Sequence, residues 1–180
     1  MQTEYEVKIL EINIEEIKKQ LEKIGAIKIA EGNMRRFVYE INLDRENRLG
    51  KWIRLRDDSE KSTLTIKEIL YKGIDGTKET EIEVNNFEKT NQLIRLMGFK
   101  PHAYQENKRI SYKGGNIDFE IDSYPKIPTS LEIEGKSVED VEKAIISLGF
   151  KREDATSIGV TDVYDKYELD INQFNELKFE

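Results

Sequence analysis

The chain has 180 residues, of which 37% are apolar and 36% charged, and its net charge is −7 at pH 7. Seven Phe, eight Tyr and one Trp are enough to build a core, which excludes a disordered chain. The absence of cysteine excludes disulfides, thiolate metal sites and cysteine nucleophiles, and a single histidine argues against zinc clusters and Ser-His-Asp triads. The acidic balance argues against generic nucleic-acid binding. Because the sequence has neither a run of 18 apolar residues nor a signal-peptide pattern at Met1, we expect a cytoplasmic protein.

Alternation of apolar and polar residues predicts eight strands, and helical spacing of apolar residues predicts four helices. In chain order, we expect first a strand at Glu4–Leu10 and a helix at Ile14–Ile24 capped by Asn13. Four strands follow, at Arg36–Leu43, Lys51–Asp57, Ser62–Ile69 and Lys78–Val84, and then a helix capped by Asn85 or Asn86. The last elements are strands at Glu106–Tyr112, Asn116–Ser123 and Ser130–Glu134, a helix capped by Ser137, and a short helix at Val160–Leu169. The tandem glycines Gly114 and Gly115 predict a tight hairpin turn. No Pro/Gly/Ser-rich linker divides the chain, so we expect one domain over residues 1–180.

Each of the first three predicted helices ends at a glycine that an apolar residue follows. Gly25, Gly98 and Gly149 fit the left-handed position after a helix, with the next residue packing back on it. The apolar spacing predicts the buried faces of the four helices, which are Ile14, Ile17, Leu21 and Ile24; Phe87, Leu93, Ile94 and Met97; Val138, Val141, Ile145 and Leu148; and Val163, Tyr164 and Tyr167.

The polar faces of the predicted strands carry regular rows of charge. Glu4, Glu6 and Lys8 share one face of the first strand, and Arg54 and Arg56 share one face of a later strand. For any single strand, a solvated polar face is the simplest interpretation. Nearly every strand carries such a row, however, although Glu, Asp and Lys are disfavoured in strands. We therefore predict an α+β fold in which an eight-stranded antiparallel β-barrel holds these rows inside and the amphipathic helices pack outside.

A barrel interior that holds both carboxylates and cations is costly in stability, and a bound ligand would explain it. Carboxylates two residues apart, without His or Cys, are hard oxygen ligands that suit Mg²⁺ or Mn²⁺. Arg and Lys on neighbouring strands suit phosphate oxygens. Neither GxxxxGK[ST] nor GxGxxG occurs, so phosphate binding would come from side chains. The residues therefore indicate a site for a metal-chelated triphosphate.

Glu4, Glu6 and Lys8 form an ExExK motif that resembles the signature of the CYTH superfamily, the triphosphate tunnel metalloenzymes. The resemblance continues in order along nearly the whole chain. Its further matches are Trp52-Ile53-Arg54-Leu55-Arg56, Leu64-Thr65-Ile66-Lys67, Lys78-Glu79-Thr80-Glu81, Glu106-Asn107-Lys108-Arg109, Ile121-Asp122-Ser123-Tyr124-Pro125, Leu131-Glu132-Ile133-Glu134-Gly135 and Tyr164-x-Lys166-Tyr167. The resemblance implies an eight-stranded antiparallel tunnel, as in class IV adenylate cyclases, thiamine triphosphatases and inorganic tripolyphosphatases.

The resemblance also implies roles for the residues of these motifs. Catalysis would rest on Glu4, Glu6 and Lys8. The triphosphate would be bound by Lys8, Arg54, Arg56, Lys67, Arg109 and Lys166. The metal, Mg²⁺ or Mn²⁺, would be held by Glu4, Glu6, Glu79, Glu81, Asp122, Glu132 and Glu134. Asn107 stands where relatives often have lysine, and the segment around Glu40 does not reproduce an acidic element often present there, so we assign neither a role.

Three functions remain open on the sequence. The leading hypothesis is metal-dependent hydrolysis of a triphosphate, and inorganic tripolyphosphate is the favoured substrate because no motif marks a base pocket. The alternative is a class IV adenylate cyclase, in which the ribose 3′-OH of ATP attacks the α-phosphorus and pyrophosphate leaves. A non-catalytic module that binds polyphosphate or nucleotides is less favoured, because the expected metal ligands are all present. We expect no nucleic-acid or membrane partner, and either a monomer or a homodimer.

Three further residues have no role in these motifs. His102, which follows Pro101 in a predicted loop, is expected to be a surface imidazole isolated from the charged strands. Trp52 shares the strand face of Arg54, and it either lines the tunnel mouth or packs as an ordinary aromatic. Arg36 fits a tunnel end and the surface equally well.

Overall fold

The computed structural model describes residues 1–44, 46–47 and 49–180. Its main strands are β1 (Gln2–Ile9), β2 (Ile27–Asp44), β3 (Leu49–Asp57), β4 (Ser62–Ile69), β5 (Thr77–Val84), β6 (Ala103–Gly114), β7 (Ile117–Ser123) and β8 (Ser130–Gly135). Its α-helices are α1 (Ile14–Lys23), α2 (Phe87–Leu96), α3 (Val138–Ser147) and α4 (Val160–Lys166). Shorter elements are the 3-10 helices Arg152–Asp154 and Ile171–Gln173 and the strands β9 (Ala155–Thr156) and β10 (Glu176–Leu177).

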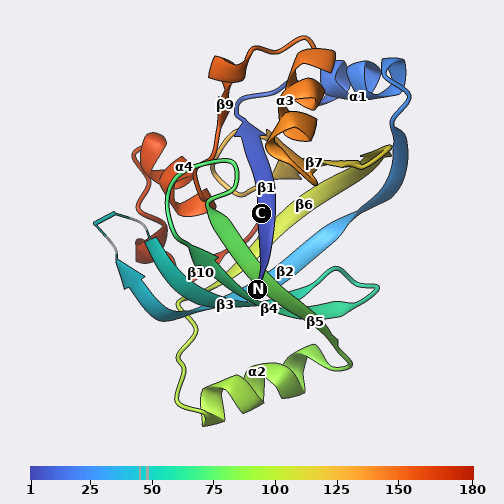
Figure 1. Cartoon of the computed structure of the whole chain (residues 1–180). Coiled ribbons are helices and arrows are strands. Elements are labelled where there is room, and N and C mark those ends of the chain that lie inside the picture. The colour runs from blue at the N-terminus through green and yellow to red at the C-terminus, as the bar shows by residue number, and fades with distance from the viewer. Residues whose placement is uncertain (45, 48) are drawn as a thin grey trace.

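The eight main strands form a closed antiparallel β-barrel (Figure 1). Hydrogen bonding runs in the order β6-β2-β3-β4-β5-β1-β8-β7, and β7 pairs again with β6, which closes the ring. Because the ring is closed, each main strand has a partner strand at both of its edges for at least part of its length. One side of the sheet faces the barrel interior, and the helices pack on the other side. The predicted fold class is confirmed, with the four helices packed outside the barrel.

β2 is much longer than the predicted strand Arg36–Leu43. It begins at Ile27, which pairs with Lys113 of β6. The first half of β2 lacks regular alternation and contains Ala30 and Gly32, which have low strand propensity. Pairing with β6, a strand far away in the sequence, therefore makes this segment extended, and a local pattern could not have predicted it.

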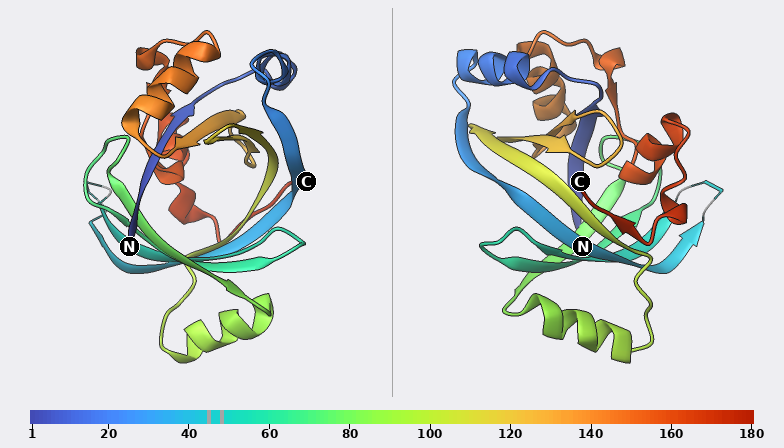
Figure 2. Two further views of the ribbon diagram at one scale, coloured as in Figure 1. Left: turned by 45° about the vertical axis from the view of Figure 1, so that its right-hand side comes forward. Right: turned by 180° about the vertical axis from the view of Figure 1, so that it is seen from behind.

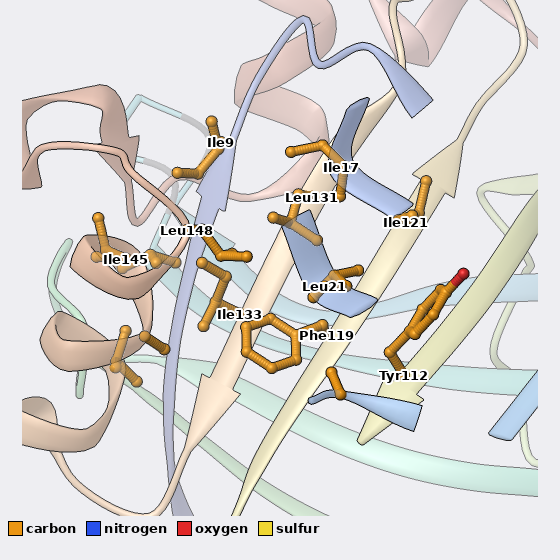
Figure 3. Close-up of a cluster of buried hydrophobic side chains, with 14 of the residues drawn as sticks. Ile9, Ile17, Leu21, Tyr112, Phe119, Ile121, Leu131, Ile133, Ile145 and Leu148 are labelled. Atoms are coloured by element: carbon orange, nitrogen blue, oxygen red, sulfur yellow. The ribbon is translucent and has the colours of Figure 1, made fainter. Parts of the chain in front are cut away.

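The helices α1 and α3 cover the outer faces of β1, β7 and β8. Figure 3 shows Leu21 of α1 and Ile145 of α3 packed near Ile133 of β8 and Phe119 of β7. All four side chains are almost completely buried. Each such burial contributes about 1.5–3 kcal/mol to folding. This apolar layer holds in place the strands that carry ExExK and the Glu132–Glu134 pair.

The helix ends follow the sequence signals. The predicted caps accept backbone N–H bonds with their side chains, namely Asn13, Asn86 and Ser137. Positive φ angles occur at all three predicted helix-ending glycines, namely Gly25, Gly98 and Gly149. The residue after each glycine donates its N–H to a carbonyl of the last turn, as Ala26 does to Leu21 at 2.9 Å. No helix in the described part of the chain is long and apolar enough to cross a membrane.

The helix α2 lies on the opposite side of the barrel from α1 and α3, as both views of Figure 2 show. Its buried residues are Phe87, Asn91 and Ile94. The predicted face was wrong at Leu93 and Met97, which are 60% and 67% exposed. Because α2 packs through a narrow i, i+4, i+7 row, residues on either side of that row remain in solvent even though they are apolar.

The C-terminal segment differs from its prediction in length. Of the predicted helix Val160–Leu169, only Val160–Lys166 is helical. Glu168 has a positive φ of 59°, which ends the helix. Tyr164 is 1% exposed and its hydroxyl donates to the carbonyl of Pro125 at 2.7 Å, so the segment is anchored to the loop between β7 and β8.

Candidate active site

The charged rows of the strands meet inside the barrel, where the structure has a cavity of about 190 Å³. Seven of the predicted site residues line this cavity, namely Glu6, Lys8, Arg54, Arg56, Lys67, Arg109 and Glu132. In the left view of Figure 2 the strands form a ring, and the C-terminal segment, drawn in red, lies across its opening. Residues 157–162 and 171–172 of this segment also line the cavity.

Two of the cations are held in place by carboxylates. Arg109 donates from Nε to Asp122 Oδ1 at 2.8 Å and from Nη2 to Asp122 Oδ2 at 2.5 Å. Lys8 Nζ lies 2.7 Å from Glu132 Oε2 and 3.6 Å from Glu6 Oε1. Burial by itself would lower the pKa of Arg109, but Asp122 outweighs burial and raises it well above its usual value. Both cations are therefore fixed in orientation and charged before any ligand arrives.

Arg54 and Arg56 have longer contacts with carboxylates, and Arg54 Nη2 lies 3.4 Å from Glu81 Oε2 and 4.0 Å from Glu79 Oε2. Arg56 is 3.9 Å from Glu81, at the outer limit of an ion pair. Burial, reinforced by Arg54, Arg109 and Arg36, lowers the pKa of Arg56 to about 10. The Nε atom of Arg54 is buried without a hydrogen-bond partner among the described residues. This side of the cavity therefore has donors and positive charge that a bound polyanion would satisfy.

Three carboxylates come together at one place in the barrel wall. Glu6, Glu132 and Glu134 each offer an oxygen, and these oxygens lie within 4.8 Å of one another. The register explains this, because Glu6 pairs with Glu134 across β1 and β8. Burial, followed by repulsion from Glu132 and Glu6, raises the pKa of Glu134 to about 7. An all-oxygen trio with mutual repulsion fits a hard divalent cation such as Mg²⁺ or Mn²⁺.

The other predicted metal ligands do not belong to this trio, and each of them contacts a cation. Glu4 accepts from Lys67 Nζ at 2.6 Å, and Glu79 lies 3.4 Å from the same nitrogen. Glu81 accepts from Thr65 Oγ1 at 2.6 Å, and Asp122 forms the pair with Arg109. Burial raises the pKa of Glu4 to about 8, although Lys67 opposes this. These four carboxylates set the positions of the cations more directly than they offer a metal site.

Lys166, a predicted phosphate ligand, is exposed on α4 and does not line the cavity. The face of α4 that meets the cavity is its first turn, Val160 to Asp162. The structure therefore places Lys166 outside the site.

Comparison with known protein families identifies the family to which this barrel belongs. The CYTH domain model matches residues 2–157, which include every strand of the barrel. The chain belongs to the CYTH family. A "putative adenylate cyclase" of Methanocaldococcus jannaschii is 28% identical over 140 residues, which is 77% of this chain and 79% of that protein.

Several solved structures share the fold. The PH1012 protein of Pyrococcus horikoshii has a TM-score of 0.76 at 28% identity, over 89% of this chain and 98% of that one. A "putative adenylate cyclase" of Vibrio parahaemolyticus has a TM-score of 0.76 at 13% identity, over 91% and 98%. A "putative adenylyl cyclase" of Hippeastrum, described as having a dominant triphosphatase activity, has a TM-score of 0.59 at 12% identity, over 94% and 97%. At these two lower identities, the likeness concerns the fold alone.

Two residues of this CYTH chain that received no definite role from the sequence have definite places in the cavity. Arg36 is 8% exposed, donates to Gln105 Oε1 at 2.8 Å and lies 5.1 Å from the Tyr124 ring centre. It therefore belongs to the barrel interior, the first of its two predicted placements. Asn107 also faces inward and donates to Asp122 Oδ1 at 3.0 Å. It thus supports the aspartate that holds Arg109.

His102 was predicted to be isolated at the surface, and this prediction was wrong. Its side chain is 22% exposed and lines the cavity, with Nδ1 3.8 Å from Glu40 Oε1. The backbone N–H of His102 donates to Val38 at 2.7 Å, which continues the pairing of β6 with β2. The predicted strand at Glu106–Tyr112 began too late, so the sequence left His102 in a loop. Trp52 and Glu40 line the cavity as well.

Proposed function

We propose that this CYTH protein is a metal-dependent triphosphate hydrolase. The observation that carries the proposal is the arrangement inside the barrel: five predicted phosphate-binding cations line one cavity with Glu6 and Glu132, two of the three clustered carboxylates. A barrel interior of this kind is unfavourable unless its charges are matched by a ligand. A linear triphosphate chelated to a divalent cation offers the complementary distribution of charge.

The cations bind and orient the phosphate chain. Arg54 has an unsatisfied buried donor, and Arg56 has little compensating negative charge nearby. Both would gain charge-assisted hydrogen bonds from phosphate oxygens. Arg109 and Lys8 are already fixed by Asp122 and Glu132, so they present their charge without reorganisation when negative charge grows on the leaving phosphate.

Glu6, Glu132 and Glu134 would hold Mg²⁺ or Mn²⁺. The bound ion would polarise phosphate oxygens and lower the pKa of a water molecule, the two contributions on which hydrolysis of a P–O–P bond depends. The chain's own contribution is to bring three carboxylate oxygens within 4.8 Å of one another and to keep Lys8 beside them. In hydrolysis, water would attack the terminal phosphorus and the P–O bond to the leaving diphosphate would break.

Adenylate cyclase activity is the second candidate, and its specific support is the Methanocaldococcus relative at 28% identity. The same cations and carboxylates would serve it, with the ribose 3′-OH in place of water and the α-phosphorus as the target. The Hippeastrum protein, described with a dominant triphosphatase activity, is a case in which one protein of this fold is associated with both names.

The deciding experiment supplies ATP and tripolyphosphate with Mg²⁺ or Mn²⁺ and measures orthophosphate and cyclic AMP. We expect orthophosphate, loss of activity in EDTA, and loss of activity in Glu6→Gln. The matched control is Glu15→Gln, because Glu15 is an exposed carboxylate on α1 that pairs with Lys18 at the surface. Cyclic AMP as the main product would select the cyclase, and full activity after exhaustive chelation would contradict both candidates.

A further inference from the structure

The first half of β2 is paired along one edge only. Residues 27–34 pair with β6, and β3 joins the other edge of β2 only from Arg35 onward. Among the described residues, no other strand takes the place of β3 along this stretch. Residues 27–31 are all exposed, and in both views of Figure 2 this part of β2, drawn in blue and leading away from α1, lies at the border of the molecule. The backbone N–H and C=O groups that point to this side are therefore available to another strand.

A β-bulge places two charged side chains of this segment on the same face of the sheet. Ile29 is an extra residue in the pairing with β6, where the register shifts between Lys28 and Ala30. Lys28 and Glu31 are three residues apart and would lie on opposite faces of a regular strand. Because of the bulge, both lie on the outer face, opposite residues of β6 that belong to the outer apolar layer, and they form an ion pair with each other.

The segment is complementary to a second copy of itself. Ile27 and Gly32 share the inner face, because their β6 partners Lys113 and Arg109 are an even number of residues apart. When two copies run antiparallel about a twofold axis between Ile29 and Ala30, three pairs of opposite residues form. These pairs are Lys28 with Glu31, Ile27 with Gly32, and Ile29 with Ala30. Each pair joins opposite charges or a large side chain to a small one, which is the favourable arrangement for cross-strand neighbours.

Another open edge of the barrel, on β5, is not complementary to itself. β5 pairs with β1 only through residues 77–79, so residues 80–84 are paired with β4 alone within the described part of the chain. If two copies of this stretch paired with Ile82 at the twofold axis, Glu81 of each copy would lie opposite Glu83 of the other. Like charges in that position are destabilising. The complementarity of the β2 edge is therefore not shared by every exposed edge of this barrel.

We propose that the protein forms a homodimer through the open edge of β2, with residues 27–32 of two copies paired antiparallel across a twofold axis. The main chains would exchange hydrogen bonds, and Lys28 and Glu31 of each copy would contact those of the other in a ring of alternating charges. Ile27 and Ile29, which are 70% and 59% exposed, would be partly covered. The paired segment is short, so we expect a dimer that dissociates on dilution, as small interfaces generally do.

The test is sedimentation equilibrium of the full chain and of two single charge reversals. The mass of the parent protein should rise from 21.1 kDa toward twice that value as its concentration is raised to about 500 µM. Lys28→Glu makes both charged positions of the edge acidic, and Glu31→Lys makes both basic, so each variant alone should remain monomeric. An equimolar mixture of the two should restore the dimer, because an acidic edge then lies opposite a basic one. Both reversals in one chain should also restore it.

Glu83→Lys is the matched control, because Glu83 is an exposed strand glutamate that pairs with Lys61, and this variant should dimerise as the parent does. The side chains of Lys28 and Glu31 are 46% and 54% exposed, so the reversals should fold, and melting curves check this. If one single reversal does not fold, the other one and the double reversal decide the test.

A parent protein that stays monomeric would overturn the inference. So would a dimer that neither single reversal weakens, or single reversals that do not associate when they are mixed. None of these outcomes bears on the proposed hydrolase, because Lys28 and Glu31 do not line the cavity.

Discussion

Glu132 and Glu134 stand two residues apart on β8, and their replacement by glutamine should change stability in opposite directions. Both belong to the carboxylate trio with Glu6. Glu132 Oε2 lies 2.7 Å from Lys8 Nζ, and Glu132 Oε1 lies 3.5 Å from Arg109 Nη2. The surroundings of Glu134 are dominated instead by burial and by the charges of Glu132 and Glu6.

The expected gain for Glu134→Gln follows from its pKa. Burial and repulsion raise the pKa of Glu134 from 4.5 to about 7. Because one pKa unit corresponds to about 1.4 kcal/mol, ionised Glu134 lowers the free energy of unfolding by about 3 kcal/mol at pH 8. A buried amide with incomplete hydrogen bonding costs about 1–3 kcal/mol. The net effect should be a gain of about 1 kcal/mol, or roughly 2–4 °C in Tm for a chain of this size.

The expected loss for Glu132→Gln follows from its two partners. Burial alone would raise the pKa of Glu132, but Lys8 and Arg109 outweigh burial and hold it well below its usual value. Removing the carboxylate takes from buried Lys8 its nearer partner and leaves it 3.6 Å from Glu6, whereas Arg109 keeps its contact with Asp122. Breaking a buried ion pair in this way costs about 3–5 kcal/mol, which corresponds to a fall in Tm of roughly 6–20 °C.

The assay is a set of melting curves by circular dichroism at pH 8, in EDTA and then with Mg²⁺ and tripolyphosphate. Glu139→Gln is the control, because Glu139 is an exposed carboxylate on α3. Both site variants should gain less from the ligands than the parent protein does, since a ligand that binds only the native state raises stability in proportion to its affinity. Shifts of the same sign in EDTA would refute the assigned environments, and an undiminished gain from ligands would refute the metal trio.

Three other predictions concern Arg56, the pH dependence of stability, and Tyr39. Arg56→Met should raise the Tm of the ligand-free protein, because burial and neighbouring arginines disfavour the charged form of Arg56 and lower its pKa. Calorimetry should show that the same change weakens tripolyphosphate binding about 30-fold (~2 kcal/mol). An unchanged affinity would place Arg56 outside the site. The free energy of unfolding of the ligand-free protein, measured by urea denaturation, should fall as the pH rises from about 5 to 8. The folded state raises the pKa values of Glu4, Glu120 and Glu134, so the folded protein holds more protons in this range than the unfolded chain does. A rise in stability with pH would contradict this reasoning. Tyr39→Phe should lower the free energy of unfolding by about 1–2 kcal/mol and leave activity unchanged, because the Tyr39 hydroxyl donates to Asn91 Oδ1 at 2.7 Å outside the barrel. A loss of activity without a loss of stability would contradict this prediction.

Much of the fold could be predicted from local pattern. The face on which each charged residue lies follows from strand alternation, which is why Glu6, Lys8 and Arg54 were correctly placed inside the barrel. The helix boundaries at Asn13 and Gly25 follow from capping chemistry, which depends on a few adjacent residues. These features are local, so the sequence alone determines them.

The neighbours of a residue across the sheet could not be predicted from local pattern. Alternation specifies the face of a strand on which a residue lies, but not the residue of the next strand that it contacts. The register of β1 against β8 puts Glu6 opposite Glu134 and leaves Glu4 to bond with Lys67, so only some of the predicted metal ligands cluster. No pattern in the sequence distinguishes Glu4 from Glu6 in this respect.

The remaining lining of the cavity was likewise decided by tertiary structure. His102 enters the site because β6 pairs with β2 further toward its N-terminal end than its own pattern indicates. Ile158 and Ile171 reach the barrel because Tyr164 is anchored to Pro125, 39 residues earlier in the chain. The sequence by itself determined the fold class and the charged interior, because these depend on periodicity within each strand. The composition of the cavity was decided only by folding, because it depends on contacts between segments far apart in the chain.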